Sequence, residues 1–306
     1  MFAVHCGFYG QRPGQSPVPH GCVMRAKWVK SALVLAAALS LGACGLAKLA
    51  YQQADWLFTD RVAELAGIEG DARSALQQRV AKVHQWHRTN ELPAYAKLMD
   101  DVVVAVDRGM SKTDAAALYE RGRGYYRELA AELVMAAGPT LSSLSPEQVI
   151  VFEDNLETDN ESYKERFAAA TLEARREARR ERVLERVEQF VDDISESQRE
   201  MVFKYSDAFP DSGPLWYDYR LAQQIRVLRV LREQQGEQAV LDTLRRWYVE
   251  GADRGPRLQA MTVQLEDNLA AMVAGLVASL SAEQRAGLKE TLSDYATLAR
   301  ELAAGD

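Results

Sequence analysis

Residues 144–148 read Leu-Ser-Pro-Glu-Gln, and an apolar residue followed by a hydroxyl and, three residues later, an acid or amide returns at three other joints of the chain. In this pattern, the capping box, the Ser side chain accepts a hydrogen bond from the third helical residue. That residue's side chain in turn accepts one from the Ser backbone. An apolar residue precedes each Ser, and Pro146 falls at the first helical position, where its missing N–H costs nothing. The pattern therefore predicts helices that begin after four serines: Ser111, Ser145, Ser195 and Ser281.

From Asp71 onward the whole chain has this helical character. Apolar side chains recur at helical spacing, and the alternation typical of strands is nearly missing. The segment 173–186 interleaves Glu with Arg, which favours a solvent-exposed helix over a nucleic-acid-binding arm. Proline and glycine concentrate at four expected joints: Gly109, Gly138-Pro139, 210–214 and 251–256. We predict an all-α bundle of about nine or ten helices in antiparallel hairpins.

Residues 24–44, MRAKWVKSALVLAAALSLGAC, determine the expected location of the protein. Three basic residues precede a thirteen-residue apolar run, 31–43. As a helix this run reaches only about 20 Å, short of the roughly 30 Å hydrocarbon core of a bilayer. It therefore fits the apolar region of a signal peptide. Leu41-Gly42-Ala43-Cys44 resembles the bacterial lipobox, which implies cleavage between Ala43 and Cys44 and a diacylglycerol on the Cys44 thiol. The alternative is an ordinary secretory signal that leaves Cys44 as a free thiol.

The leader, residues 1–23, fits no part of a signal peptide. We expect it to be a gene-model artefact with Met24 as the true start, although a genuine extension is an alternative. The expected organisation is then a signal peptide over 24–43 and a mature helical lipoprotein domain over 44–306. Gly45 stands where an Asp would resemble an inner-membrane retention signal. We therefore expect a lipid-anchored protein on the periplasmic face of the outer membrane.

The composition of residues 44–306 narrows the range of partners. Cleavage removes four basic residues and no acidic ones, so 33 basic residues remain against 44 acidic ones, a net charge near −11. This balance argues against nucleic acid and against electrostatic docking on anionic lipid. The expected membrane attachment is therefore the lipid on Cys44, and an envelope protein is the expected partner. Four large side chains close to Cys44 either pack on the core, the commoner fate, or rest at the lipid interface: Tyr51, Trp56, Leu57 and Phe58.

The segment 84–95 concentrates the side chains that most often carry function. It holds both histidines of the mature chain, with an Arg, a Glu, a Trp and a Tyr. His84 and His87 are a weak candidate for a metal site, because zinc usually takes three or four ligands. Pro93 disfavours helix in the residue before it, so we expect a helix–helix corner here with Asn90 as a cap.

The candidate interaction site consists of five residues of this corner: Trp86, His87, Arg88, Glu91 and Tyr95. The alternative is a structural network in which His87, Arg88 and Glu91 pin the corner, with Trp86 in the core. The sequence contains none of the common fingerprints of nucleotide binding, zinc proteolysis or serine hydrolysis. We therefore expect neither an enzyme nor a bound cofactor, with carboxylate-only catalysis left open.

Four blocks of the chain together resemble a family of Gram-negative lipoproteins of unknown function. Beyond the lipobox they are Tyr51-x-x-Ala54-Asp55-Trp56, Trp86-His87-Arg88-x-x-Glu91-Leu92-Pro93-x-Tyr95, the segment 144–148 and Asn160-x-x-Tyr163. The resemblance implies a location and a fold and no mechanism. The expected role is an envelope interaction or scaffold protein. A holdase-like chaperone is the alternative, since Leu-Ser-x-x-Gln is similar to a motif of small periplasmic stress chaperones, and an envelope enzyme ranks last.

Overall fold

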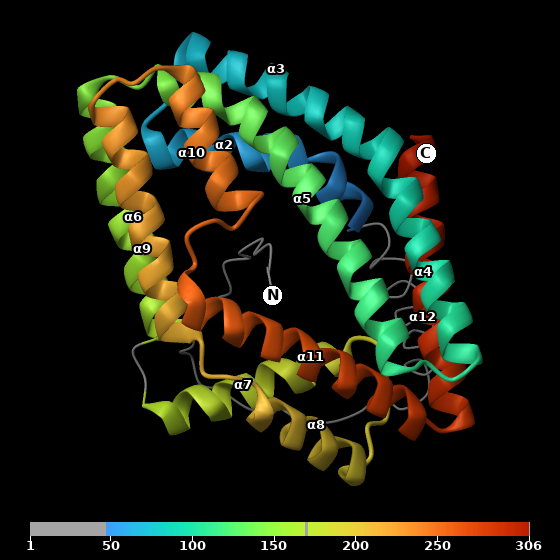
Figure 1. Ribbon diagram of the computed structural model, residues 1–306. Coiled ribbons are helices and arrows are strands. Elements are labelled where there is room, and N and C mark those ends of the chain that lie inside the picture. The colour runs from blue at the N-terminus through green and yellow to red at the C-terminus, as the bar shows by residue number, and fades with distance from the viewer. Residues whose placement is uncertain (1–46, 169–170, 306) are drawn as a thin grey trace, which may run out of the picture. The chain divides into compact units, whose positions relative to one another are not determined.

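The computed structural model describes residues 47–168 and 171–305, and all of their regular elements are helical (Figure 1). One π-helical turn, η1 (His87–Glu91), joins two α-helices without a break. Residues 47–52 form a short helical stretch, and eleven α-helices follow: α2 (Ala54–Ala66), α3 (Gly70–Trp86), α4 (Leu92–Asp107), α5 (Lys112–Ser142), α6 (Pro146–Phe167), α7 (Leu172–Glu188), α8 (Glu196–Ala208), α9 (Gly213–Arg232), α10 (Glu237–Tyr248), α11 (Gly255–Ser279) and α12 (Ala282–Ala304). The prediction of an all-α bundle is confirmed.

The predicted leader, signal peptide and Cys44 lie outside the described residues. In the described part of the chain, none of the helices is long and apolar enough to cross a membrane.

All four predicted capping boxes are present. Ser111, Ser145, Ser195 and Ser281 begin α5, α6, α8 and α12, and in each the Ser side chain and the side chain three residues later exchange hydrogen bonds with the backbone. The residue before each Ser packs on a core, as the staple requires: Met110, Leu144, Ile194 and Leu280.

The expected joint at Gly138-Pro139 is wrong, because both residues lie inside α5. Gly138 is needed there for packing: a Cβ at this position would overlap the side chain of Leu241 in α10. Beside the proline, Arg79 of α3 donates from Nε to the carbonyl of Ala136 at 2.9 Å. The helix therefore continues through the proline because neighbouring helices hold it on both sides.

Two hydrophobic cores form, and two long helical elements contribute to both. The first core takes side chains from α2, α3, α6, α9, α10 and the end of α5; the second takes them from α7, α8, α11, α12, the end of α4 and the start of α5. The element α3–η1–α4 gives Leu76, Val80 and Val83 to the first core and Ala105 and Val106 to the second. The π-turn therefore lies between the two cores.

Only some of the helix pairs are the expected hairpins. Sequential neighbours pack together in α2/α3, α7/α8 and α9/α10. The most extensive pairing, however, joins α4 to α12 at the far end of the chain, and α5 packs along both α3 and α10 (Figure 1). The long helices thus connect segments that are far apart in the sequence.

The glutamines of three capping boxes also hold neighbouring segments. While its Oε1 accepts from the Ser backbone, each Nε2 donates elsewhere: Gln148 to the Gly67 carbonyl at 2.9 Å, Gln198 to the Ser279 carbonyl at 3.1 Å and Gln284 to the Asp193 carbonyl at 3.0 Å. Gln198 and Gln284 also bond to each other, which joins the starts of α8 and α12. A glutamate would supply only the acceptor half of this arrangement.

Gln198→Glu tests this double role, because Gln198 is buried with 4% of its surface exposed. The substitution keeps the capping acceptor and directs a carboxylate at the Ser279 carbonyl and the Gln284 amide oxygen. We expect a loss of about 1–3 kcal/mol in the free energy of unfolding, measured by urea denaturation at pH 8. The control Gln259→Glu, exposed on α11, should change stability by less than about 0.5 kcal/mol. Equal effects of the two variants would contradict the double role.

Candidate functional site

The segment 84–95 is a continuous helix rather than the expected corner. At η1 the backbone widens: the Leu92 N–H bonds to the His87 carbonyl, five residues back. This shift places Pro93 in the first turn of α4, where it is tolerated. The expectation of a helix–helix corner before Pro93 is therefore wrong, because the extra residue in the turn accommodates the proline ring without ending the helix.

Asn90 does not cap a new helix. Its Nδ2 donates backward to the Trp86 carbonyl at 2.9 Å, and Thr89 Oγ1 donates to the Gln85 carbonyl at 3.1 Å. These side-chain bonds support carbonyls that a widened turn leaves poorly satisfied. Thr89-Asn90 followed by Pro93 is thus the local sequence that stabilises the π-turn.

Side chains on and next to this turn contact Tyr51 from the helical stretch before α2. We call this group the π-turn cluster: Tyr51, His84, His87, Arg88, Glu91 and Tyr95. Tyr51 Oη lies 2.9 Å from His87 Nδ1, and its ring lies 4.6 Å from that of His84. The ring of His87 contacts the ring of Tyr95 edge-on at 5.3 Å. Trp86 points elsewhere and packs against the first core.

Glu91 is the most deeply enclosed member, with 3% of its surface exposed. Burial raises the pKa of its carboxyl to about 7; the neighbouring Tyr95 hydroxyl lowers this pKa, and the Glu128 carboxyl of α5 raises it. Tyr95 also touches the ring of Tyr125, at 5.4 Å between centroids. Burial and the charge of Glu91 raise the pKa of Tyr95 in turn.

The two histidines of the cluster and Tyr51 have shifted pKa values as well. Burial, followed by the charge of neighbouring His84, lowers the pKa of His87 to about 4. Burial also lowers the pKa of His84, while Asp55 raises it and Arg88 lowers it again. Burial raises the pKa of Tyr51 to about 12 against the opposing effect of the Arg88 guanidinium. At neutral pH both imidazoles are therefore uncharged and Tyr51 is a neutral phenol.

His87, Arg88 and Glu91 do not bond to one another as the structural alternative supposed. His87 contacts the stretch before α2, and Glu91 contacts α5. Arg88 lies beside Tyr51 and within about 4 Å of the point where a Cβ would stand at Gly305, just after α12. The turn therefore joins three elements that are distant in sequence.

The cluster combines shifted pKa values with buried polar atoms that lack partners. In residues 47–168 and 171–305 no three His, Cys, Asp or Glu side chains are grouped as a metal ion would require. Three buried polar atoms of the cluster have no hydrogen-bond partner among the described residues: His84 Nε2, Arg88 Nε and Glu91 Oε2. Perturbed titratable groups and under-satisfied buried atoms are both enriched at functional sites.

Two surface hollows lie away from the cluster. One is lined by charged residues of α4 and α5, including Asp101 and Arg121, and the other by residues of α6 and α9, including Glu153 and Arg232. The predicted site residues line neither of them. A carboxyl with a pKa near 7, such as that of Glu91, would suit a general base. Side chains enclose Glu91, however, and occupy the space from which a substrate would have to approach it.

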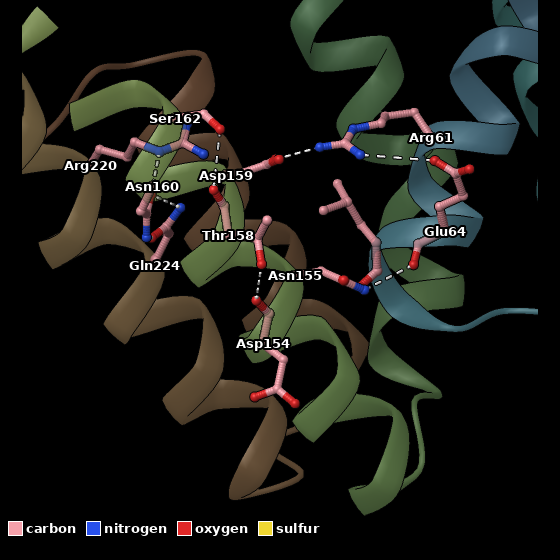
Figure 2. Close-up of polar contacts among 11 residues, drawn as sticks. Arg61, Glu64, Asp154, Asn155, Thr158, Asp159, Asn160, Ser162, Arg220 and Gln224 are labelled. Carbon is pink, nitrogen blue, oxygen red and sulfur yellow. Dashed lines mark hydrogen bonds and ion pairs between the residues drawn. The ribbon is translucent and has the colours of Figure 1, made fainter. Parts of the chain in front are cut away.

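A second buried polar cluster explains the Asn160-x-x-Tyr163 block. Figure 2 shows Asn160 of α6 facing Gln224 and Arg220 of α9. Asn160 Nδ2 donates to Gln224 Oε1 at 2.6 Å, and Asn160 Oδ1 accepts from Arg220 Nε at 2.6 Å and from Gln224 Nε2 at 3.1 Å. The Arg220 guanidinium lies 5.5 Å from the centre of the Tyr163 ring. The block therefore fixes the contact between α6 and α9.

The same helix also holds the end of α2. Asn155 donates to the carbonyls of Glu64 and Leu65, both at 3.1 Å, and Arg61 pairs with Asp159 (Figure 2). The last carbonyls of a helix have no partner within it. Side chains of α6 thus reinforce the end of α2, which Gly67 already caps in the left-handed conformation.

A family model matches residues 65–247, more than half of the chain: the family of unknown function DUF6279. The chain belongs to this family. The match contains most of the π-turn cluster and the whole Asn160 cluster, whereas Tyr51 and Cys44 precede it. No curated protein and no solved structure matches the chain. Membership therefore defines a family and leaves its biochemical role unknown.

Sequence reasoning missed Tyr51, Tyr125 and Glu128 as members or neighbours of the site. Tyr51 precedes α2, and Tyr125 and Glu128 lie on α5, so no spacing along the chain reveals their contact with the π-turn. One signal was present: Tyr51 heads one of the blocks that carry the family resemblance. The glutamate at 128 has no such signal.

Glu91→Gln should reveal the raised pKa of Glu91. Because the folded protein holds this proton more tightly than the unfolded chain, the contribution of Glu91 to the free energy of unfolding is full below about pH 4.5. It is lost as the pH rises through about 7. The variant should resemble the wild type at pH 4.5 and exceed its stability by about 2–3 kcal/mol at pH 8, as measured by denaturant unfolding at both pH values.

Glu157→Gln is the control, since Glu157 is exposed on α6. It should shift stability by less than about 0.5 kcal/mol at either pH. A Glu91→Gln protein that is less stable than the wild type at pH 8 would show that the carboxylate is stabilised in the fold, contrary to its burial.

Proposed function

We propose that the protein is a lipid-anchored helical protein of the periplasmic face of the outer membrane, whose body binds another envelope protein. The lipobox-like Leu41-Gly42-Ala43-Cys44 supports the anchor, and Gly45 supports the outer membrane. Two or three acyl chains hold a protein durably where a single chain does not. Two features of the helical body accord with a role in binding. Its polar clusters join helices, and Glu91, the carboxyl with the raised pKa, is enclosed by side chains.

The observation that carries the proposal is the way the body holds its first described helical residues. Ala47, three positions after Cys44 in the sequence, is already helical. Lys48 pairs with Glu301 of α12 at 2.9 Å, and Tyr51 bonds to His87 of the π-turn. An anchor at Cys44 would therefore hold the π-turn cluster close to the membrane rather than at the end of a long tether.

Mass spectrometry of the mature N-terminus tests the anchor. We expect residue 44 as the first residue, carrying a diacylglycerol on its thiol and an acylated amine. Cys44→Ala should move the protein from the membrane fraction to the soluble one. Cys22→Ala is the matched control, because it removes a thiol that the proposal excludes from the mature protein. An unmodified Cys44, or membrane retention of Cys44→Ala, would overturn the anchor.

Photo-crosslinking in cells tests the binding role. A photoreactive residue at Gln85, exposed beside the π-turn, should give one or two defined adducts that the same residue at Gln259, exposed on α11, does not. Many adducts with unfolded proteins would indicate a holdase-like chaperone instead. The Leu-Ser-x-x-Gln pattern gives that reading no separate support, because its Ser and Gln already serve in helix capping. Identical adducts from both positions would contradict a specific surface at the π-turn.

A further inference from the structure

The first helical segment exposes an apolar stripe close to the proposed anchor. Helical hydrogen bonds continue through Gln53: its N–H bonds to the Leu49 carbonyl at 3.2 Å, and its carbonyl accepts from the Leu57 N–H at 2.9 Å. Leu49, Gln53, Trp56 and Leu57 therefore fall at positions i, i+4, i+7 and i+8 of one helix, on one face. We call these four residues the outer stripe.

The opposite face of the same helix is committed to the body. Tyr51 contacts the π-turn cluster, and Phe58 packs against the first core, which also takes Ala63 and Ala66. We expected the large side chains after Cys44 either to pack on the core or to rest at the lipid interface. Tyr51 and Phe58 point inward to the body, whereas Trp56 points outward. Within residues 47–168 and 171–305 the outer stripe has no such partner: Leu49 is 55% exposed, and Trp56 and Leu57 are each 43% exposed.

None of the four residues of the outer stripe is charged. The only charged residue between Leu49 and Leu57 is Asp55, and its carboxylate acts on His84 on the inner side. Charges begin immediately beyond the stripe: Asp60 pairs with Arg73 at 2.6 Å, and Arg61 pairs with Asp159. Lys48, at the end of the helix near Cys44, pairs with Glu301 of α12, so the outer stripe lies between charged residues and carries no charge itself.

We infer that the outer stripe rests in the surface of the phospholipid bilayer that holds the lipid on Cys44. This inference depends on the proposed anchor. Leu49 is five positions after Cys44, so even a fully extended chain keeps Leu49 within about 18 Å of the acylated cysteine. The stripe is about 12 Å long along the helix axis, which matches the width of an interfacial region better than that of a hydrocarbon core.

The residue types fit this occupant. Tryptophan is enriched where bilayer and water meet, because its ring is apolar and its N–H needs a polar partner. Leucine adds apolar area on either side of it. A partner protein held by charge would find no charge on this face, whereas a lipid surface requires none.

The test uses the mature protein reconstituted in vesicles of phosphatidylethanolamine and phosphatidylglycerol, with brominated phospholipid as a quencher of tryptophan fluorescence. The emission of Trp56 is the difference in fluorescence between the wild type and Trp56→Phe. We expect the quencher to remove most of this emission. Trp247→Phe is the matched control: Trp247 packs against the first core, so its loss should leave the quenched component intact. The double variant Leu49→Ser, Leu57→Ser should keep the melting temperature and lose the quenching.

Failure of this inference is distinguishable from failure of the anchor. An acylated protein whose Trp56 is not quenched would overturn the inference and leave the anchor standing. If Cys44 proves unmodified, the same mature protein is added to preformed vesicles. Quenching that depends on Trp56 would still support a lipid-facing stripe, and no quenching would overturn the inference. A dimer that Trp56→Ser abolishes, with no quenching, would assign the stripe to a second copy of the chain and also overturn the inference.

Discussion

The structure depends on one helix that does not break at a proline. An α-helical turn before Pro93 would bring the ring against the carbonyl four residues back, and the helix would end there. The π-turn adds one residue to that turn, so α3 and α4 continue as one helical element without a break. That element contributes to both hydrophobic cores, and the pairings of α3 with α5 and of α4 with α12 follow from its length.

The widened turn also explains why polar side chains are buried at the middle of the molecule. A π-turn shifts the following residues around the helix axis, which directs His87 and Glu91 to different neighbours. Burial then acts on both groups in the same direction, toward the neutral form. It lowers the pKa of His87 to about 4 and raises that of Glu91 to about 7. Between pH 4.5 and 6.5 the two groups therefore have opposite effects on stability. As the pH rises through this range, His87 makes the folded state more stable, whereas Glu91 makes it less stable.

Features encoded by a few adjacent residues could be predicted, and features that need distant partners could not. The capping boxes at Ser111, Ser145, Ser195 and Ser281 were predicted because the pattern contains its own hydrogen-bond partners. The fold class followed from the same signals. Gly138-Pro139 and Pro93 were read as breaks because local rules place proline at helix ends. In the structure, Leu241 and Arg79 hold the first within its helix, and a π-turn accommodates the second.

The candidate site shows the same limit. The segment 84–95 was found from its composition, yet its partners Tyr51 and Glu128 come from other elements.

The acidic body restricts how the protein can approach a membrane. A net charge near −11 over residues 44–306 repels an anionic lipid surface, and screening weakens this repulsion only beyond about 8–10 Å. An acyl anchor at Cys44 with no tether before Ala47 would bring the first helix well inside that distance. A neutral apolar face can be accommodated there without opposing the lipid charge. The inward direction of Asp55 and the outward direction of Trp56 follow from a single helical period, since adjacent residues lie about 100° apart. The rotation that lets Tyr51 reach the π-turn therefore also turns the outer stripe away from the acidic body.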